Sequence, residues 1–195
     1  MSMCFRTGLL ISCIVSSWTC SSAVPTDVPG VSAVGDHVRR YEGADLEVVL
    51  GTGYAAGHVG EEYLFVGATL AGTNGERMTT VDRAEISVRT PDRRKIPLLS
   101  QEDFREVYGK LNVPARLAEA FSPTMLDSKP TRRPCGDWFF EAPTDGIARD
   151  VLTISSVEVC DGILFFHVPG GVQPGRWVLE INLEESVVEI PFFLD

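Results

Sequence analysis

The sequence predicts a mainly β protein, an antiparallel β-sandwich with a short helical insertion around residues 100–121. Two observations predict this class. Apolar and polar residues alternate with period two over much of the chain after residue 45, as in the segment 83–90, and this alternation is typical of strands with one buried face. Turn-forming pairs such as Asn74-Gly75 and Pro91-Asp92 stand between several of these segments. Many short strands joined by turns favour a sandwich or a barrel.

Nine segments carry the strand pattern. They are 46–50, 62–71, 83–90, 95–99, 137–142, 151–160, 162–169, 176–183 and 187–194. The pair Asp161-Gly162 is expected to form the turn between two of them. The runs Trp138-Phe139-Phe140 and Phe165-Phe166 place large apolar groups on both faces of their strands, so both faces need a cover. We expect the opposite sheet to cover one face and the helical insertion to cover the other, with a partner surface or self-association as the alternative.

One stretch departs from the period of two. Four apolar residues there share a spacing of i, i+3, i+4 and i+7, which predicts a helix with one buried stripe. The stripe consists of Phe104, Val107, Tyr108 and Leu111. Ser100 suits the N-cap, and Asp103 stands where a capping box places an acid. Pro114 is expected to open a second short helix that carries Leu117 and Phe121.

Residues 1–23 have the layout of a secretory signal. Arg6 is their one basic residue, an apolar run follows, and the small residues Ser21 and Ala23 precede the expected cleavage point. The apolar run is shorter than the roughly 20 residues of a spanning helix. A buried N-terminal helix and a lipoprotein with its lipid on Cys20 are the alternatives. Residues 24–45 are expected to form a tether, which leaves 46–195 as one domain.

Removal of the signal would leave two cysteines. Cys4, Cys13 and Cys20 lie in the signal, whereas Cys135 and Cys160 remain. Two cysteines in an oxidising compartment predict one disulfide. Closing a loop of about 25 residues contributes roughly 3–3.5 kcal/mol on the chain-entropy model. A pair of buried free thiols is the alternative. No later segment reaches membrane-spanning length, so the cleaved product is expected to have no membrane span.

The C-terminal third resembles secreted immunoglobulin-like sandwich domains. The resemblance lies in the string Pro174-Gly175-Arg176-Trp177-Val178-Leu179-Glu180-Ile181, where a turn leads into a strand near the C-terminus. The cysteine spacing departs from the antibody type, because Trp138 follows Cys135 almost directly instead of standing at the expected core position. The resemblance implies an immunoglobulin-like architecture and no particular activity.

The composition excludes several functional classes. The chain has 17 basic and 27 acidic residues and a formal charge of -10, whereas a nucleic-acid binder needs a basic face. Its three histidines share no ligand spacing, so we expect no metal and no cofactor. The string Gly51-x-Gly53-x-x-Ala56 has the letters of a dinucleotide-binding motif. Because Gly57 and Gly60 interrupt the helix that must follow, we expect a glycine-rich loop instead.

Histidines and carboxylates offer the remaining chemistry. His58 stands near Glu61 and Glu62 and could bind a metal weakly, while His167 is expected to be a core or edge residue. Four acids are expected to form a solvated edge that discourages aggregation. These are Glu180, Glu184, Glu185 and Glu189. The chain has no G-x-S-x-G elbow, the motif that carries the nucleophilic serine of many hydrolases. An exported hydrolase that uses acidic residues instead is kept as an alternative function.

The favoured function is an exported, non-enzymatic module that binds a protein or an envelope component. Three basic residues of the loop 122–136 are the expected contacts, namely Lys129, Arg132 and Arg133, beside Trp138 and Phe140 of an aromatic strand. A basic loop on an acidic body attracts anionic partners, while aromatic groups supply contact area. A solvated connection without a binding role is the alternative for this loop, and a structural subunit of an extracytoplasmic assembly is a further alternative for the protein.

The first prediction concerns export. In its natural host the chain is expected to lose about 23 residues, because the basic, apolar and small-residue regions of 1–23 are those that an export peptidase recognises. Intact-mass measurement of the secreted or periplasmic product checks this. A product that begins at Cys20 with added lipid mass would show the anchored form, and a product that retains Met1 would contradict both.

Overall fold

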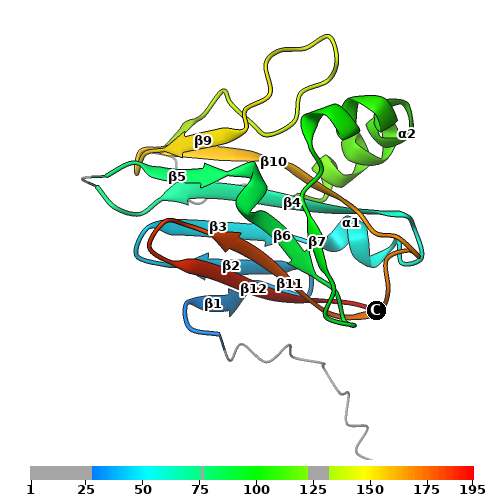
Figure 1. Ribbon diagram of the computed structural model, residues 1–195. Coiled ribbons are helices and arrows are strands. Elements are labelled where there is room, and N and C mark those ends of the chain that lie inside the picture. The colour runs from blue at the N-terminus through cyan, green and yellow to red at the C-terminus, as the bar shows by residue number, and fades with distance from the viewer. Residues whose placement is uncertain (1–27, 76, 123–131) are drawn as a thin grey trace, which may run out of the picture.

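The computed structural model describes residues 28–75, 77–122 and 132–195, and it is mainly β (Figure 1). This confirms the mainly β part of the prediction. The first strands are β1 (Val31–Ala33), β2 (Val38–Glu42), β3 (Leu46–Gly51), β4 (Tyr63–Gly72), β5 (Thr79–Asp82), β6 (Ile86–Arg89) and β7 (Lys95–Pro97). The later strands are β8 (Arg133–Pro134), β9 (Val151–Ile154), β10 (Glu158–His167), β11 (Gly175–Asn182) and β12 (Val187–Leu194). The helices are α1 (Gly53–Ala56), the 3-10 turn η1 (Arg83–Glu85) and α2 (Gln101–Ala120).

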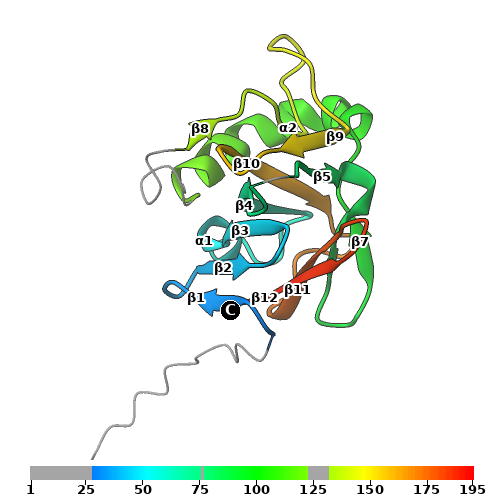
Figure 2. The same cartoon turned by 90° about the vertical axis from the view of Figure 1, so that its left-hand side faces the viewer.

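The described strands form three sheets. The largest has six strands in the order β1-β2-β3-β4-β10-β8, antiparallel except for the short β10–β8 pair. A four-stranded antiparallel sheet has the order β12-β11-β6-β7, and β5 pairs with β9. Figures 1 and 2 show α2 and the strands β10 and β4 above β11 and β12, while β1 and β2 of the same six-stranded sheet lie beside β12. One hydrophobic cluster contains residues of all three sheets, such as Val48, Val81 and Leu179.

The immunoglobulin-like arrangement that the C-terminal string implies is not confirmed. Immunoglobulin domains of the constant type pack a four-stranded sheet on a three-stranded one, whereas these sheets have six, four and two strands. The string itself does form a strand, because Gly175–Asn182 is β11 at an inner position of its sheet. A turn leading into a strand is a local feature, and it leaves the strand order undetermined.

The expected tether 24–45 differs from the structure in its second half. Strands β1 and β2 lie within it, and β2 pairs with β3 from Val38↔Gly51 to Glu42↔Glu47. Their burial does not alternate cleanly, since β2 has one buried residue, Arg39. Period-two patterning therefore misses the edge strand β1 and its neighbour β2. Residues 31–42 belong to the folded body.

The helical insertion forms one helix where two were expected. Ser100 caps α2 as predicted, because its hydroxyl accepts a hydrogen bond from the Asp103 backbone N–H at 3.0 Å. Pro114 lies inside the helix and does not divide it. Inside a helix a proline removes the N–H that would bond the carbonyl four residues back, and its ring crowds that carbonyl, which costs about 3 kcal/mol. Packing of Leu111 and Ala118 on both sides of it, each at most 2% exposed, holds the two halves in one helix.

Strand β10 runs through the expected Asp161-Gly162 turn. Asp161 and Gly162 pair with Thr69 and Ala68 of β4, so the two strands predicted at 151–160 and 162–169 are β9 and the longer β10. The turn between them lies at residues 155–157. Glycine is needed at position 162 for another reason. A Cβ there would lie 2.3 Å from the indole nitrogen of Trp138.

The expected strand 137–142 is an irregular segment, yet its aromatic residues are buried. Trp138, Phe139 and Phe140 are 7%, 0% and 7% exposed. The Trp138 indole N–H donates to the carbonyl of Ile163 in β10 at 3.1 Å, and the Leu99 N–H donates to the carbonyl of Phe165 at 2.9 Å. These bonds satisfy edge carbonyls of β10 beyond its short pairing with β8. The segment therefore protects a sheet edge without being a strand.

A buried arginine fixes the far end of the same segment. The Arg83 guanidinium donates to the carbonyls of Phe139 and Arg149, and it lies 5.0 Å from the centroid of the Phe140 ring. Burial lowers the pKa of Arg83, partly offset by Asp150, whose carboxylate is 3.2 Å from the Arg83 Nε. Arg83 thus joins residues 139–150 to the β5–β9 pair.

A substitution of Gly162 tests the packing of Trp138. Gly162→Ala is expected to lower the free energy of unfolding by about 1–3 kcal/mol, because its methyl group needs space that the indole ring occupies. Urea denaturation measures the change. Gly109→Ala is the matched control: a Cβ at this position in α2 meets nothing within 4 Å, so it should raise stability by about 0.5–1 kcal/mol. Equal effects of the two variants would contradict the packing argument.

Candidate functional site

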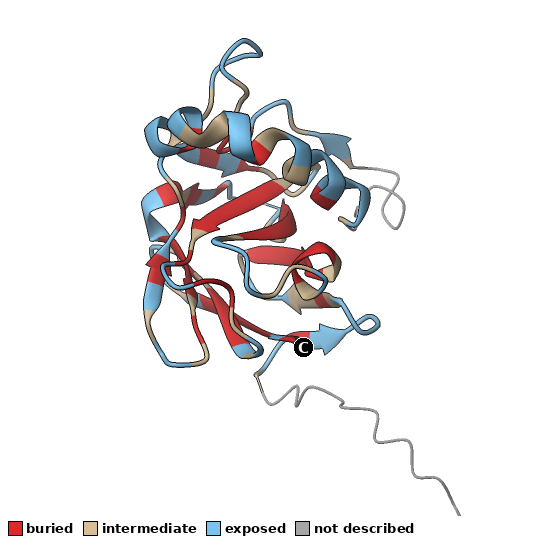
Figure 3. Cartoon of the chain, turned by 90° about the vertical axis from the view of Figure 1, so that its right-hand side faces the viewer, coloured by how far each residue is buried: buried red, intermediate tan, exposed pale blue. Residues whose placement is uncertain are grey.

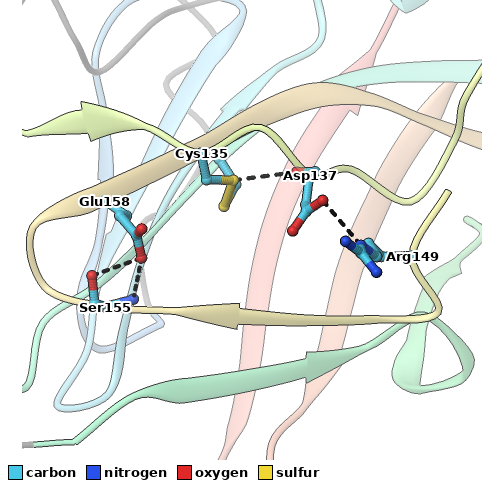
Figure 4. Close-up of a disulfide and its surroundings, with 6 residues drawn as sticks. Cys135, Asp137, Arg149, Ser155 and Glu158 are labelled. Carbon is cyan, nitrogen blue, oxygen red and sulfur yellow. Dashed lines mark hydrogen bonds and ion pairs between the residues drawn. A yellow bond between two sulfur atoms is a disulfide. The ribbon is translucent and has the colours of Figure 1, made fainter. Parts of the chain in front are cut away.

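The disulfide predicted from the cysteine count is present. Cys135 follows β8, Cys160 lies in β10, and their Cα atoms are 4.9 Å apart (Figure 4). The bond fixes the short strand β8 beside β10, where the Arg133 N–H and the Cys135 N–H also donate to carbonyls of Val157 and Val159. The end of the predicted binding loop is therefore covalently held to the sheet.

Arg132 of that loop is in an ion pair with a buried carboxylate. Its Nη1 lies 3.2 Å from Glu47 Oε2, and the two side chains are 12% and 2% exposed. On the other side, Arg40 binds Glu47 Oε1 through Nε at 2.9 Å and Nη2 at 2.6 Å. Arg40 also pairs with Glu42, which is 59% exposed. Most of the Arg132 charge is thus directed at the protein's own sheet instead of at solvent.

The other predicted contacts lie in different environments. Arg133 is exposed on β8, whereas Trp138 and Phe140 are each only 7% exposed. Lys129 and the alternative lipid site Cys20 lie outside the described residues. The sequence predicts one continuous surface made of the loop cations and the aromatic rings. Those of its residues that the structure describes do not form such a surface. The reason is that Trp138 and Phe140 belong to the core.

The helix α2 provides the cover that was expected for the aromatic face. Phe104 of α2 lies 5.0 Å from Phe140 and 4.9 Å from Phe165 of β10 between ring centroids. Phe140 and Phe165 meet edge to face at 4.8 Å, and Phe165 contacts Phe65 of β4 in the same way. Such pairs contribute about 0.5–1.5 kcal/mol each beyond area burial. These contacts bind the N-terminal half of the helix to the sheet, and Leu111 and Ala118 extend the buried side toward its C-terminus.

The C-terminal half of α2 exposes an apolar stripe. Val113, Leu117 and Phe121 follow one another at i, i+4 and i+8, and they are 63%, 51% and 62% exposed. This spacing puts them on one helix face, with Leu111 and Ala118 about 100–120° away from Leu117 around the helix axis. The side chain of Phe121 also lies beside Gly53 of α1. Figure 3 shows α2 with much of its length exposed. We refer to Val113, Leu117 and Phe121 as the α2 stripe; exposed apolar groups gathered in this way mark interaction sites.

The sequence contains a signal for this stripe. Leu117 and Phe121 stand four residues apart, which puts them on one helix face. Leu111 and Ala118 occupy the inward face in the structure, at 1% and 2% exposure. Because apolar residues lie on both sides of this half of α2, only the tertiary contacts show which side is buried.

The predicted acidic edge has two parts. Glu180 and Glu189 both bind Arg89 across the outer face of the four-stranded sheet. Glu184 and Glu185 instead line a cavity of about 130 Å³ together with Asp45 and Arg77. Small-molecule sites usually enclose about 300–1,000 Å³. This cavity is therefore smaller than a typical substrate site.

The histidines and the glycine-rich string take structural positions. His167 lies at the end of β10 with its Nε2 3.3 Å from Glu62 Oε1. His58 stacks on Tyr54 at 3.8 Å, and its Nδ1 is 2.7 Å from the Tyr54 carbonyl. The residues Gly53–Ala56 form the single turn α1 between β3 and β4, in agreement with the expected loop. In the described ranges, no three His, Cys, Asp or Glu side chains are grouped to hold a metal ion.

Comparisons with known proteins assign no family. No protein-family model matches the chain, and no curated protein matches it either. The crystal structure of the yjhA protein from Bacillus subtilis is similar to it, with a TM-score of 0.40 and 11% sequence identity. That similarity covers 80% of this chain and 96% of the other. In the part of the chain that the structure describes, no helix is both long and apolar enough to cross a membrane.

A pair of variants tests the ion pairs at Glu47. Glu47→Gln is expected to lower the free energy of unfolding by about 2–4 kcal/mol, since it removes the buried carboxylate that pairs with both Arg132 and Arg40. Urea denaturation measures this loss. Glu42→Gln removes only the pair of Arg40 with an exposed acid, so its effect should stay within about 1 kcal/mol. If both variants cost the same, the Glu47 carboxylate does not hold the loop end.

Proposed function

We propose that this chain is an exported, non-enzymatic β-sandwich module that binds a protein or envelope component through the α2 stripe. The observation that carries the proposal is the exposure of Val113, Leu117 and Phe121 on successive turns of one helix. Folded monomers seldom leave such rows of large apolar side chains in water unless they meet a partner.

Two further features support export and rigidity. The Cys135–Cys160 bond suits an oxidising compartment, in line with the secretory layout expected for residues 1–23. The N-terminal half of α2 is fixed to the sheet by Phe104, so the stripe is held on a rigid support. A binding face on a preformed element loses little conformational entropy when a partner docks.

A pull-down from envelope extract tests the proposal. The double variant Leu117→Ser/Phe121→Ser should reduce recovery of a specific partner tenfold or more, on the order expected when central apolar contacts are truncated. Ile147→Ser is the matched control, because Ile147 is a 75% exposed apolar residue outside α2 and outside the stripe. It should leave recovery unchanged, and circular dichroism should show all three proteins folded.

Two outcomes would contradict the proposal. Equal loss in the stripe variant and in Ile147→Ser would show non-specific adsorption. Turnover in a carbohydrate or peptide panel, abolished by Glu184→Gln or Glu185→Gln, would favour the alternative of an exported hydrolase and direct attention to the acid-lined cavity.

A further inference from the structure

The outer face of α2 changes character along its length. In its first two turns, exposed residues on the side of the stripe are mostly acidic: Glu102, Asp103 and Glu106. At 100° per residue, Glu106 and Leu117 lie about 20° apart around the helix axis, and Glu102 and Asp103 lie within about 60° of Leu117. The exposed Lys110 stands between the acidic and apolar halves on the same side. The face is therefore acidic at its N-terminal end and apolar at its C-terminal end.

From this division we infer that the partner is a protein segment that forms an amphipathic helix with an apolar half and a basic half. The inference rests on the proposed function, which it narrows. The apolar half would cover the α2 stripe. The basic half would lie over Glu102, Asp103 and Glu106. These three carboxylates attract cationic side chains of a partner and repel acidic ones.

The length and direction of the segment follow from helix geometry. Nineteen residue steps from Glu102 to Phe121 at 1.5 Å each span about 28 Å, so a helical partner needs about 20 residues to cover the whole face. An antiparallel partner has its apolar half at its N-terminus and its basic half at its C-terminus. That arrangement also places the partner's cations at the end of its own helix where they are stabilised.

The overall charge of the protein favours the same partner. The chain carries a formal charge of -10, so its long-range field attracts cationic segments and repels anionic membranes. It also opposes approach of a second copy. Within the helix, Asp103 is the acid least available to a partner, since its Oδ2 accepts a hydrogen bond from Ser100 at 2.6 Å. Glu102 and Glu106 are therefore the residues to change.

A charge exchange tests the inference. The probe is a synthetic 20-residue helix with leucines at i, i+4 and i+8 in its N-terminal half and three lysines in its C-terminal half; a second peptide carries glutamates in place of the lysines. By fluorescence anisotropy in low salt, the wild-type chain should bind the lysine peptide at least tenfold more tightly than the glutamate peptide. Glu102→Lys/Glu106→Lys should reverse that preference, and about 0.3 M salt should reduce both preferences.

Control variants separate this inference from the proposed function. Arg105→Glu changes a charge on the flank of α2, outside the acidic face, and should leave the preference for the lysine peptide in place. Leu117→Ser/Phe121→Ser should weaken both peptides. If that variant weakens both while the wild type does not distinguish them, the stripe binds and the charge assignment is wrong. If it weakens neither, the proposed function fails as well.

Two other occupants would overturn the inference. Cosedimentation of the wild-type chain with vesicles of phosphatidylglycerol, lost in the stripe variant, would assign the face to a membrane surface. A dimer by light scattering that becomes monomeric in the stripe variant, without affinity for either peptide, would assign it to a second copy of the chain. Reversal of the peptide preference by Glu102→Lys/Glu106→Lys is the result that supports a basic amphipathic segment.

Discussion

Burial of the central strands β4 and β10 on both faces is the constraint on which the rest of the structure depends. Nine of the ten residues of β4 are buried, and β10 has aromatic residues on opposite faces at Phe165 and Phe166, 4% and 0% exposed. One packed sheet cannot bury both faces of such a strand, because each face needs its own apolar layer against it. The other elements that pack here are arranged to supply those covers.

The helix α2 and the segment 137–140 supply them on the side of Phe165. Phe104 and Phe140 pack on that ring. Trp138 lies over Gly162, a position on the opposite face of β10, and its indole N–H donates to the Ile163 carbonyl. The helix can do this with one of its faces only. Its C-terminal half carries apolar residues on two faces, so covering the core leaves Val113, Leu117 and Phe121 exposed. The same constraint that builds the core therefore presents the proposed binding surface.

Three contacts hold the chain where it leaves α2 and returns to the sheet. Ser122 follows the helix and sits against Gly67, where a Cβ would lie 2.1 Å from its hydroxyl oxygen. On the return, Arg132 pairs with the buried Glu47, and Cys135 is bonded to Cys160. The two members of a buried ion pair depend on each other, because removal of one leaves the charge of the other uncompensated. Cations that suggested a binding loop in the sequence thus serve, in the case of Arg132, to hold the fold.

The sequence by itself determined the features that depend on neighbours along the chain. Period-two alternation located strands such as β11 and β12, the i, i+3, i+4, i+7 stripe and Ser100 located α2, and the cysteine count gave the disulfide. Tertiary structure alone decided the rest. From its neighbours in the sequence, Gly162 is expected in a turn, whereas in the structure it is a strand residue that leaves space for the Trp138 ring. Trp138 is expected in a strand or at a contact surface, whereas its indole N–H bonds a carbonyl at the edge of β10. Whether the side chains of Leu117 and Arg132 are exposed to water depends on contacts between segments that are distant in the sequence. Local sequence patterns carry no information about such contacts.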